Sequence, residues 1–362
     1  MMMTKYLTVI GALALTTTTV HAGGIERSTL SYSALFETGR VLTTSFSGVN
    51  PSVTGTYPVA FGGGSTGNMA QSYTTLSFSY KADFNDKLAY ALYFNQPFGA
   101  DANYTAGPYT GLEAHWKSDQ LAAVLKYKVT DAVSVYGGLR YLSSDAEIAI
   151  PAALLSFNYT AAGAAQDFGY LVGVAYEKPE IALRVSLTYE SAIKQSFATT
   201  EAGGPLGAAF ASVTEIELPQ SVALDLQSGV AKDTLVFGSI RWTEWSAWEV
   251  RPPGYSGVTG QAVTGFDNNV LAFKLGVGRK LNESLSVFAR IGYEEPKGGT
   301  ASRLSPTDGS KSFGFGGSYT KDNMKVTGGI EYVTVGDAAD GSGTVFAGNS
   351  ALGVGLSVAF TF

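Results

Sequence analysis

The sequence contains no cysteine and only two histidines, His21 and His115. The lack of cysteine excludes disulfide bonds and thiol chemistry. A single histidine beyond the N-terminal segment excludes a multi-histidine metal site, and a Ser-His nucleophile would have to use His115 at the start of a predicted strand. No spaced pair of carboxylates stands out for acid-base catalysis. We therefore expect neither catalysis nor a bound metal or cofactor.

Charge and long apolar runs are also scarce. Charged residues make up 15% of the chain, against about 25% in an average soluble protein. The net charge of −6 argues against a nucleic-acid partner. Beyond the N-terminal segment no apolar run approaches the roughly 18 residues of a membrane-spanning helix. With 44 glycines, 20 tyrosines and 20 phenylalanines, this composition favours many aromatic-rich strands.

The first 22 residues have the pattern of a secretory signal peptide. Lys5 supplies a positive charge, "YLTVIGALALTTTTV" an apolar region, and "VHA" a small-residue cleavage site. An uncleaved anchor helix is the alternative, but the segment is short and rich in threonine for that role. We expect residues 1–22 to be removed, so that the mature chain starts at Gly23.

Tight polar turns divide the remaining chain. Six of them carry hairpin residues, around Asp86, Asp131, Pro179, Lys232, Asn282 and Asp322. They alternate with seven longer connections, at residues 58–67, 98–112, 148–165, 195–213, 247–267, 296–310 and 337–349. This order joins fourteen strands and is typical of an outer-membrane barrel with both termini in the periplasm.

Apolar and polar residues alternate along these strands, as in "IALRVSLTYE". We therefore predict an all-β fold, a 14-stranded antiparallel transmembrane β-barrel whose apolar faces meet lipid. The alternation continues to the last residue in "GVGLSVAFTF". Because lipid cannot satisfy an open edge, the last strand is expected to pair with a strand inside "VLTTSFSGVNPSVTGTY".

Three segments resemble the outer-membrane long-chain fatty-acid transporter family (FadL). "IELPQSVALDL" resembles its Leu-Pro-x-Ser strand, "RWTEWSAWEV" its Trp-Thr-Asp-Trp-Ser segment, and "RIGYEEP…RLSPTDGSKSFGFGGSY" its Pro-x-x-Gly loop and Gly-rich strand. The resemblance implies a barrel plugged by an N-terminal hatch, which takes up hydrophobic substrates from outside and releases them sideways through its wall.

The terminal Phe is similar to the signal that the barrel-assembly machinery reads, so that machinery is an expected partner.

Residues 23–40, "GGIERSTLSYSALFETGR", precede the first strand-like run. They are expected to form a hatch in the lumen that is shorter than the hatch of the family. Residues 41–362 are left for the barrel.

The polar faces of the predicted strands place charged residues in the lumen: Lys126, Arg140, Arg184, Arg241, Lys274 and Arg290, with Glu190, Glu217, Asp225 and Glu331. Arg241, Lys274 and Arg290 fall on consecutive strands near mid-membrane, with Asp225 and Glu331 expected to flank them, so they are candidates for binding a carboxylate. Arg140 lies at the same level four strands from Arg241. A network of ion pairs that fills the lumen is the alternative.

Two tryptophans are further ligand candidates. Trp245 and Trp248 could line an apolar entry groove with Phe98 and Tyr109, or could belong to an interfacial aromatic belt.

These features predict a passive channel for hydrophobic small molecules, long-chain fatty acids first, in the outer-membrane lipid of a Gram-negative bacterium. We expect a monomer. The alternatives are a general diffusion porin, an outer-membrane protease or lipase, and a structural or adhesive barrel. Porins usually have about 16 or 18 strands and a more charged lumen, and an enzyme would depend on His115 alone.

Overall fold

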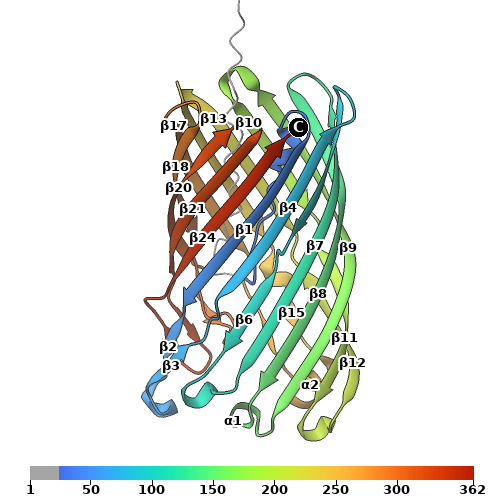
Figure 1. The fold of residues 1–362 in the computed structure, drawn as a ribbon. Coiled ribbons are helices and arrows are strands. Elements are labelled where there is room, and N and C mark those ends of the chain that lie inside the picture. The colour runs from blue at the N-terminus through green and yellow to red at the C-terminus, as the bar shows by residue number, and fades with distance from the viewer. Residues whose placement is uncertain (1–23) are drawn as a thin grey trace, which may run out of the picture.

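A closed β-barrel makes up most of the molecule (Figure 1). The computed structural model describes residues 24–362, so the predicted signal peptide lies outside the described residues. Seventeen strand segments form the wall. They are Val41–Ser52 (β1), Tyr73–Asp83 (β4), Leu88–Asn95 (β5), Gly99–Asn103 (β6), Glu113–Lys128 (β7), Val133–Ile150 (β8), Tyr159–Lys178 (β9), Leu183–Glu190 (β10), Ile193–Ala202 (β11), Phe210–Leu218 (β12), Ser221–Ala231 (β13), Thr234–Thr243 (β14), Val270–Lys280 (β17), Leu285–Glu294 (β18), Ser310–Lys321 (β20), Met324–Val335 (β21) and Ser350–Thr361 (β24).

Three strands of the barrel are interrupted. Each of these three consists of two segments that together occupy the position of one strand in the wall. β5 and β6 both pair with β7, β10 and β11 both pair with β9, and β12 and β13 continue each other beside them. The seventeen segments therefore make fourteen strands, which confirms the predicted count.

The two ends of the barrel differ. All six predicted tight turns lie at one end, together with Phe362 (Figure 1). The other end carries the long connections and short strands at Thr54–Thr56 (β2), Ser65–Asn68 (β3), Glu249–Val250 (β15), Thr264–Gly265 (β16), Thr300–Ala301 (β19), Ala338–Asp340 (β22) and Val345–Phe346 (β23). The helices are Ala152–Leu155 (α1) and Pro253–Thr259 (α2), with 3-10 turns at Tyr32–Phe36 (η1), Val59–Phe61 (η2), Gly107–Tyr109 (η3), Pro179–Ile181 (η4), Gly204–Leu206 (η5) and Trp245–Ala247 (η6).

The last strand closes the barrel on the first. β24 pairs with β1 over the whole length of both, from Val41 opposite Thr361 to Ser52 opposite Ser350. The Phe362 N–H also donates to the Arg40 carbonyl at 2.9 Å. The predicted partner of the C-terminal strand is thus confirmed.

Several strands extend further than the sequence suggested. The predicted loop at residues 148–165 is mostly strand, because β8 runs to Ile150 and β9 starts at Tyr159. The predicted loop at residues 195–213 shrinks in the same way to the residues between β11 and β12. Gly- and Ala-rich composition had suggested loops there, but backbone pairing across β8, β9 and β11 continues through both segments.

Each interruption also exchanges the two faces of its strand. In β10 the buried residues Ser186, Thr188 and Glu190 have even numbers, whereas in β11 the buried positions Ile193 and Gln195 have odd numbers. The breaks at residues 96–98 and 219–220 do the same to their strands. Because side chains alternate with period two, one extra residue turns the rest of the strand over.

The outer face of the wall is apolar. Its exposed residues include Leu121, Leu139, Phe168, Ile291, Phe313 and Leu356. Tyr127, Tyr293, Tyr319 and Tyr332 are exposed near strand ends, as in an interfacial aromatic girdle. Among residues 24–362 no helix is long and apolar enough to cross a membrane.

Candidate functional site: an apolar cavity, a break in the wall and a hatch

An apolar cavity lies inside the barrel near the long-loop end. Its lining includes Ala100, Trp116, Phe197, Ile216, Trp248 and Phe266. The same side chains belong to a buried cluster that also contains Phe98, Leu142 and Trp245. The Trp248 ring stacks on Phe266 at 5.0 Å between ring centroids, and Trp116 lies at 6.0 Å from Trp248. Flat aromatic walls of this kind suit a hydrophobic guest.

The wall beside this cavity is interrupted between β4 and β6. Pairing of β4 with β5 stops at Phe78 opposite Phe94. Beyond that point Tyr73 to Ser77 of β4 pair only with β1, because the break at residues 96–98 carries β6 away from β4. Pro97 lacks an N–H and so cannot continue the ladder. The Leu76 N–H is satisfied by the Gln96 side chain at 3.0 Å instead.

The N-terminal segment fills this interruption from inside. The Arg27 N–H donates to the Pro97 carbonyl at 2.7 Å, and the Gly99 N–H donates to the Ile25 carbonyl at 2.8 Å. Residues 25–28 thus act as a short extra strand against the displaced backbone. We use "hatch" for residues 24–40, which continue through the lumen and bury Tyr32 and Leu35 against Tyr93, Tyr136 and Leu171 of the wall.

An ion pair and a cation–π contact hold the hatch in the interruption. The Arg27 guanidinium forms an ion pair with Asp101 on β6 and lies 4.2 Å from the centroid of the Tyr73 ring on β4. His115 Nδ1 lies 2.7 Å from the other oxygen of Asp101. Gly99 makes room for this arrangement, since a Cβ there would lie 2.5 Å from Arg27 Cδ. The sequence did not single out Arg27, and it left His115 without a partner.

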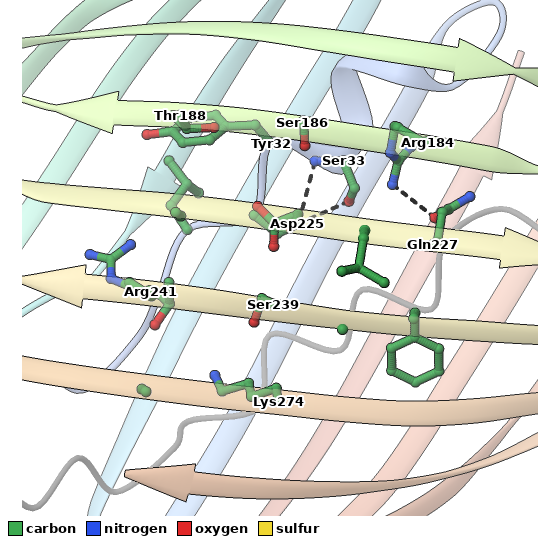
Figure 2. A pocket seen from close by; sticks show the side chains of 18 of the residues that line it. Tyr32, Ser33, Arg184, Ser186, Thr188, Asp225, Gln227, Ser239, Arg241 and Lys274 are labelled. Carbon is green, nitrogen blue, oxygen red and sulfur yellow. Dashed lines mark hydrogen bonds between the residues drawn. The ribbon is translucent and has the colours of Figure 1, made fainter. Parts of the chain in front are cut away.

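A second, polar cavity lies between the hatch and the wall (Figure 2). Ser186, Asp225, Ser239 and Lys274 face one another in register across four adjacent strands. Arg184 on β10 donates to Gln227 at 3.0 Å and lies 4.8 Å from the Phe36 ring of the hatch. The lumen toward the tight-turn end is therefore polar and occupied by the hatch.

Three of the six predicted lumenal cations, Arg140, Arg241 and Arg290, form ion pairs with carboxylates. Glu190 lies between Arg140 and Arg241, with nitrogen–oxygen distances of 3.8 and 3.5 Å, and accepts from the Tyr32 hydroxyl at 2.5 Å. Arg241 also pairs at 2.9 Å with Glu26 of the hatch. Buried ions of opposite sign stabilise one another only when they are paired in this way. Removing one partner therefore costs folding free energy.

Arg290, the third of these cations, has a separate carboxylate partner. Arg290 on β18 pairs with Glu331 on β21 across Gly314 of the intervening strand. The expectation that Asp225 and Glu331 only flank the cations was therefore wrong for Glu331, since an arginine side chain spans two strands when the residue between them is a glycine. Lys274 lines the polar cavity with Arg241 and Arg290. That these cations bind a ligand stays a prediction.

The other residues predicted to face the lumen or to line a groove lie partly inside the barrel and partly on its outer face. Trp248 lines the apolar cavity, while Trp245 is fully buried behind it against Gly24 of the hatch. Phe98 joins them, but Tyr109 lies in a different cluster. Glu217 was predicted in the lumen and lies on the outer face, 3.4 Å from Lys194, because the break at residues 219–220 turns β12 over.

A cap of loops closes the long-loop end. Glu201 accepts hydrogen bonds from the N–H groups of Gly254 and Tyr255 at the start of α2, at 2.8 and 2.6 Å. Tyr109 donates to Asp340 at 2.5 Å. Burial, and then the hydrogen bond to Asp340, raise the pKa of the Tyr109 phenol. The hydroxyl therefore stays protonated, and this contact persists, up to a pH above its ordinary pKa of about 10.

A closed barrel with a filled lumen, an apolar cavity under a loop cap and a plugged break in its wall defines a class of outer-membrane channel. The family model described as "outer membrane protein transport protein (OMPP1/FadL/TodX)" matches residues 32–341. The chain belongs to this family of outer-membrane channels for hydrophobic compounds. No curated protein matches the sequence.

Solved structures agree on the fold. A Pseudomonas aeruginosa FadL homologue superposes with a TM-score of 0.74 at 12% identity, covering 91% of this chain and 92% of that one. The Pseudomonas putida toluene transporter TodX gives 0.64 at 12% identity, with 96% and 98% covered. The Ralstonia pickettii toluene transporter TbuX gives 0.64 at 11%, with 99% of each chain covered. At these identities the likeness concerns the fold alone.

Proposed function

We propose that the protein is a passive channel for hydrophobic small molecules, long-chain fatty acids first among them. The observation that carries this proposal is the apolar cavity beside the interruption between β4 and β6. Ile25 of the hatch lines this cavity, and residues 25–28 fill the interruption beside it. Sideways release keeps an apolar guest out of water. Passage through the polar lumen below the cavity would not keep it out of water.

Binding of a fluorescent fatty acid to the purified protein tests this function. We expect saturable binding that an excess of unlabelled fatty acid displaces. Insertion into planar bilayers separates the channel from a general diffusion porin. The hatch and its ion pairs fill the lumen, so a large steady current would contradict the proposal and favour the porin.

The polar cavity is proposed as a second binding site, which holds the carboxylate of a fatty acid. Movement of the hatch would remove Glu26 from Arg241 and leave Glu190 as its carboxylate partner, while Arg290 and Lys274 line the same space. Arg241→Ala or Arg290→Ala should then weaken fatty-acid binding by about 1.5–3 kcal/mol, the usual contribution of a charge-assisted hydrogen bond. A neutral lipophile of equal length should bind as before. Equal losses for both ligands would mean that the substitutions damage the barrel.

A further inference from the structure

Three tryptophan side chains around the apolar cavity have buried N–H groups without an acceptor. Trp116, Trp245 and Trp248 each leave Nε1 without a hydrogen-bond partner among the described residues. They are 5%, 0% and 4% exposed. Buried polar groups in folded proteins are almost always hydrogen-bonded, and an unpartnered one costs about 1–3 kcal/mol. Three in one cluster need a physical explanation.

Two of the three indoles belong to the wall of the cavity itself. Trp116 on β7 and Trp248 after η6 both line it, with ring centroids 6.0 Å apart. Trp245 lies behind them, and its Nε1 faces Gly24, where a Cβ would come within 2.6 Å of that nitrogen. Trp116 and Trp248 are therefore the two of the three whose side chains line the cavity.

Several polar side chains around the same cavity already have partners. The Thr199 hydroxyl donates to Thr214 at 2.8 Å, and the Thr264 hydroxyl lies 2.6 Å from Ser302 Oγ. His115 uses Nδ1 for Asp101. An indole N–H donates only, so its partner must be an acceptor. Glu147 and Ser305 are the other polar residues of the lining besides Thr214, and neither of them accepts a hydrogen bond from these two nitrogens.

We propose that Trp116 and Trp248 are specificity-determining donors, and that the cavity selects lipophiles carrying an acceptor oxygen over plain hydrocarbons. The inference rests on the proposed function, which places a hydrophobic guest in this cavity. The oxygen is supplied by an ionised carboxylate or by the carbonyl of a neutral ester. Rings pack against the alkyl chain while one or both Nε1–H groups reach the oxygen. A site built to hydrogen-bond its ligand rejects an analogue that leaves its donors unpaired.

Matched ligands test the inference. Dodecanoate, its methyl ester and dodecane share a chain length but differ in the oxygen. We expect the acid or the ester to bind about ten- to a hundredfold more tightly than dodecane, as one or two hydrogen bonds to otherwise unpaired donors would give. A preference for the acid alone identifies a carboxylate, and equal affinity for acid and ester identifies the carbonyl oxygen.

Substitution of each tryptophan locates the effect. Trp116→Phe and Trp248→Phe remove the N–H and keep an aromatic ring. Each should reduce the preference for the oxygenated ligand over dodecane by about three- to tenfold. Trp242→Phe is the matched control, because Trp242 lies on β14 and does not line the cavity. A folded variant that binds dodecane normally shows that the barrel is intact.

Nuclear magnetic resonance of the unsubstituted protein provides a readout independent of folding defects. With 15N-labelled tryptophan the four indoles of the chain give four N–H signals. The oxygenated ligand should shift the Trp116 or Trp248 signal downfield, and dodecane should not. Equal affinity for all three ligands with unmoved signals would overturn the inference and leave the channel function intact. Failure of all three to bind would instead contradict the proposed function.

Discussion

Arg290 and Glu331 form an ion pair across a strand that belongs to neither of them. The residue between them in register is Gly314, where a Cβ would lie 3.2 Å from Arg290 Nε. The absence of a side chain at this position is what lets the guanidinium cross β20. Filling the gap should therefore separate the pair.

Gly314→Val is expected to destabilise the barrel by about 2–4 kcal/mol, because it displaces one partner of a buried ion pair. The temperature at which the folded form disappears in heat-modifiability gels measures the effect. Gly328→Val is the control, since a Cβ at Gly328 meets nothing closer than 3.9 Å. Equal behaviour of the two variants would show that the pair does not depend on the glycine.

A reversible cross-link can test whether the hatch must leave the wall. The Asn95 side chain donates to Ser28 Oγ at 3.2 Å, and the chain has no cysteine of its own. In Ser28→Cys/Asn95→Cys, oxidation should stop uptake of a labelled fatty acid and reductant should restore it. The single variant Ser28→Cys should transport under both conditions. Undiminished uptake by the fully oxidised double variant would mean that the cargo leaves by another route.

The cap should loosen when Glu201 is removed. This carboxylate holds α2 through the N–H groups of Gly254 and Tyr255 and also accepts from the Tyr159 hydroxyl at 2.8 Å. Glu201→Ala should expose the buried Tyr255 and raise chymotrypsin cleavage after it severalfold. Glu217→Ala, on the outer face of the neighbouring strand, should leave the rate unchanged. Identical digestion of both variants would assign the rigidity of α2 to packing.

Loss of Phe362 should impair assembly. The residue ends the strand that closes the barrel, and its N–H donates to Arg40. Deleting Phe362 or replacing it with Asp should lower the amount of folded, heat-modifiable protein in the outer membrane while synthesis and secretion continue. Normal amounts of folded protein would refute a role for the terminal residue.

The sequence by itself determined the number, order and closure of the strands. Each tight turn has local chemistry that needs no distant partner, as at Asp131 or Asn282. Alternation of apolar residues marks a strand that meets lipid, because every second side chain must be apolar there. The pairing of the last strand with the first follows from the rule that lipid leaves no edge unsatisfied.

The inward and outward faces were predictable only up to an interruption. Period-two alternation was extended through Pro219, which placed Glu217 in the lumen. A single extra residue in the backbone reverses every side chain beyond it, and composition does not mark where that residue is inserted. Glu217 consequently faces Lys194 on the outer surface.

The partners of the lumenal charges were decided by the tertiary structure alone. Arg241 was recognised as a lumenal cation, but its partner Glu26 is 215 residues away in the hatch. Arg27, Tyr73 and Asp101 meet only because the break at residues 96–98 separates β6 from β4 and the hatch enters the space between them. Local sequence specifies which residues can form a strand and which face meets lipid. It does not specify where a separate segment settles inside the barrel, because that depends on packing among residues far apart in the chain.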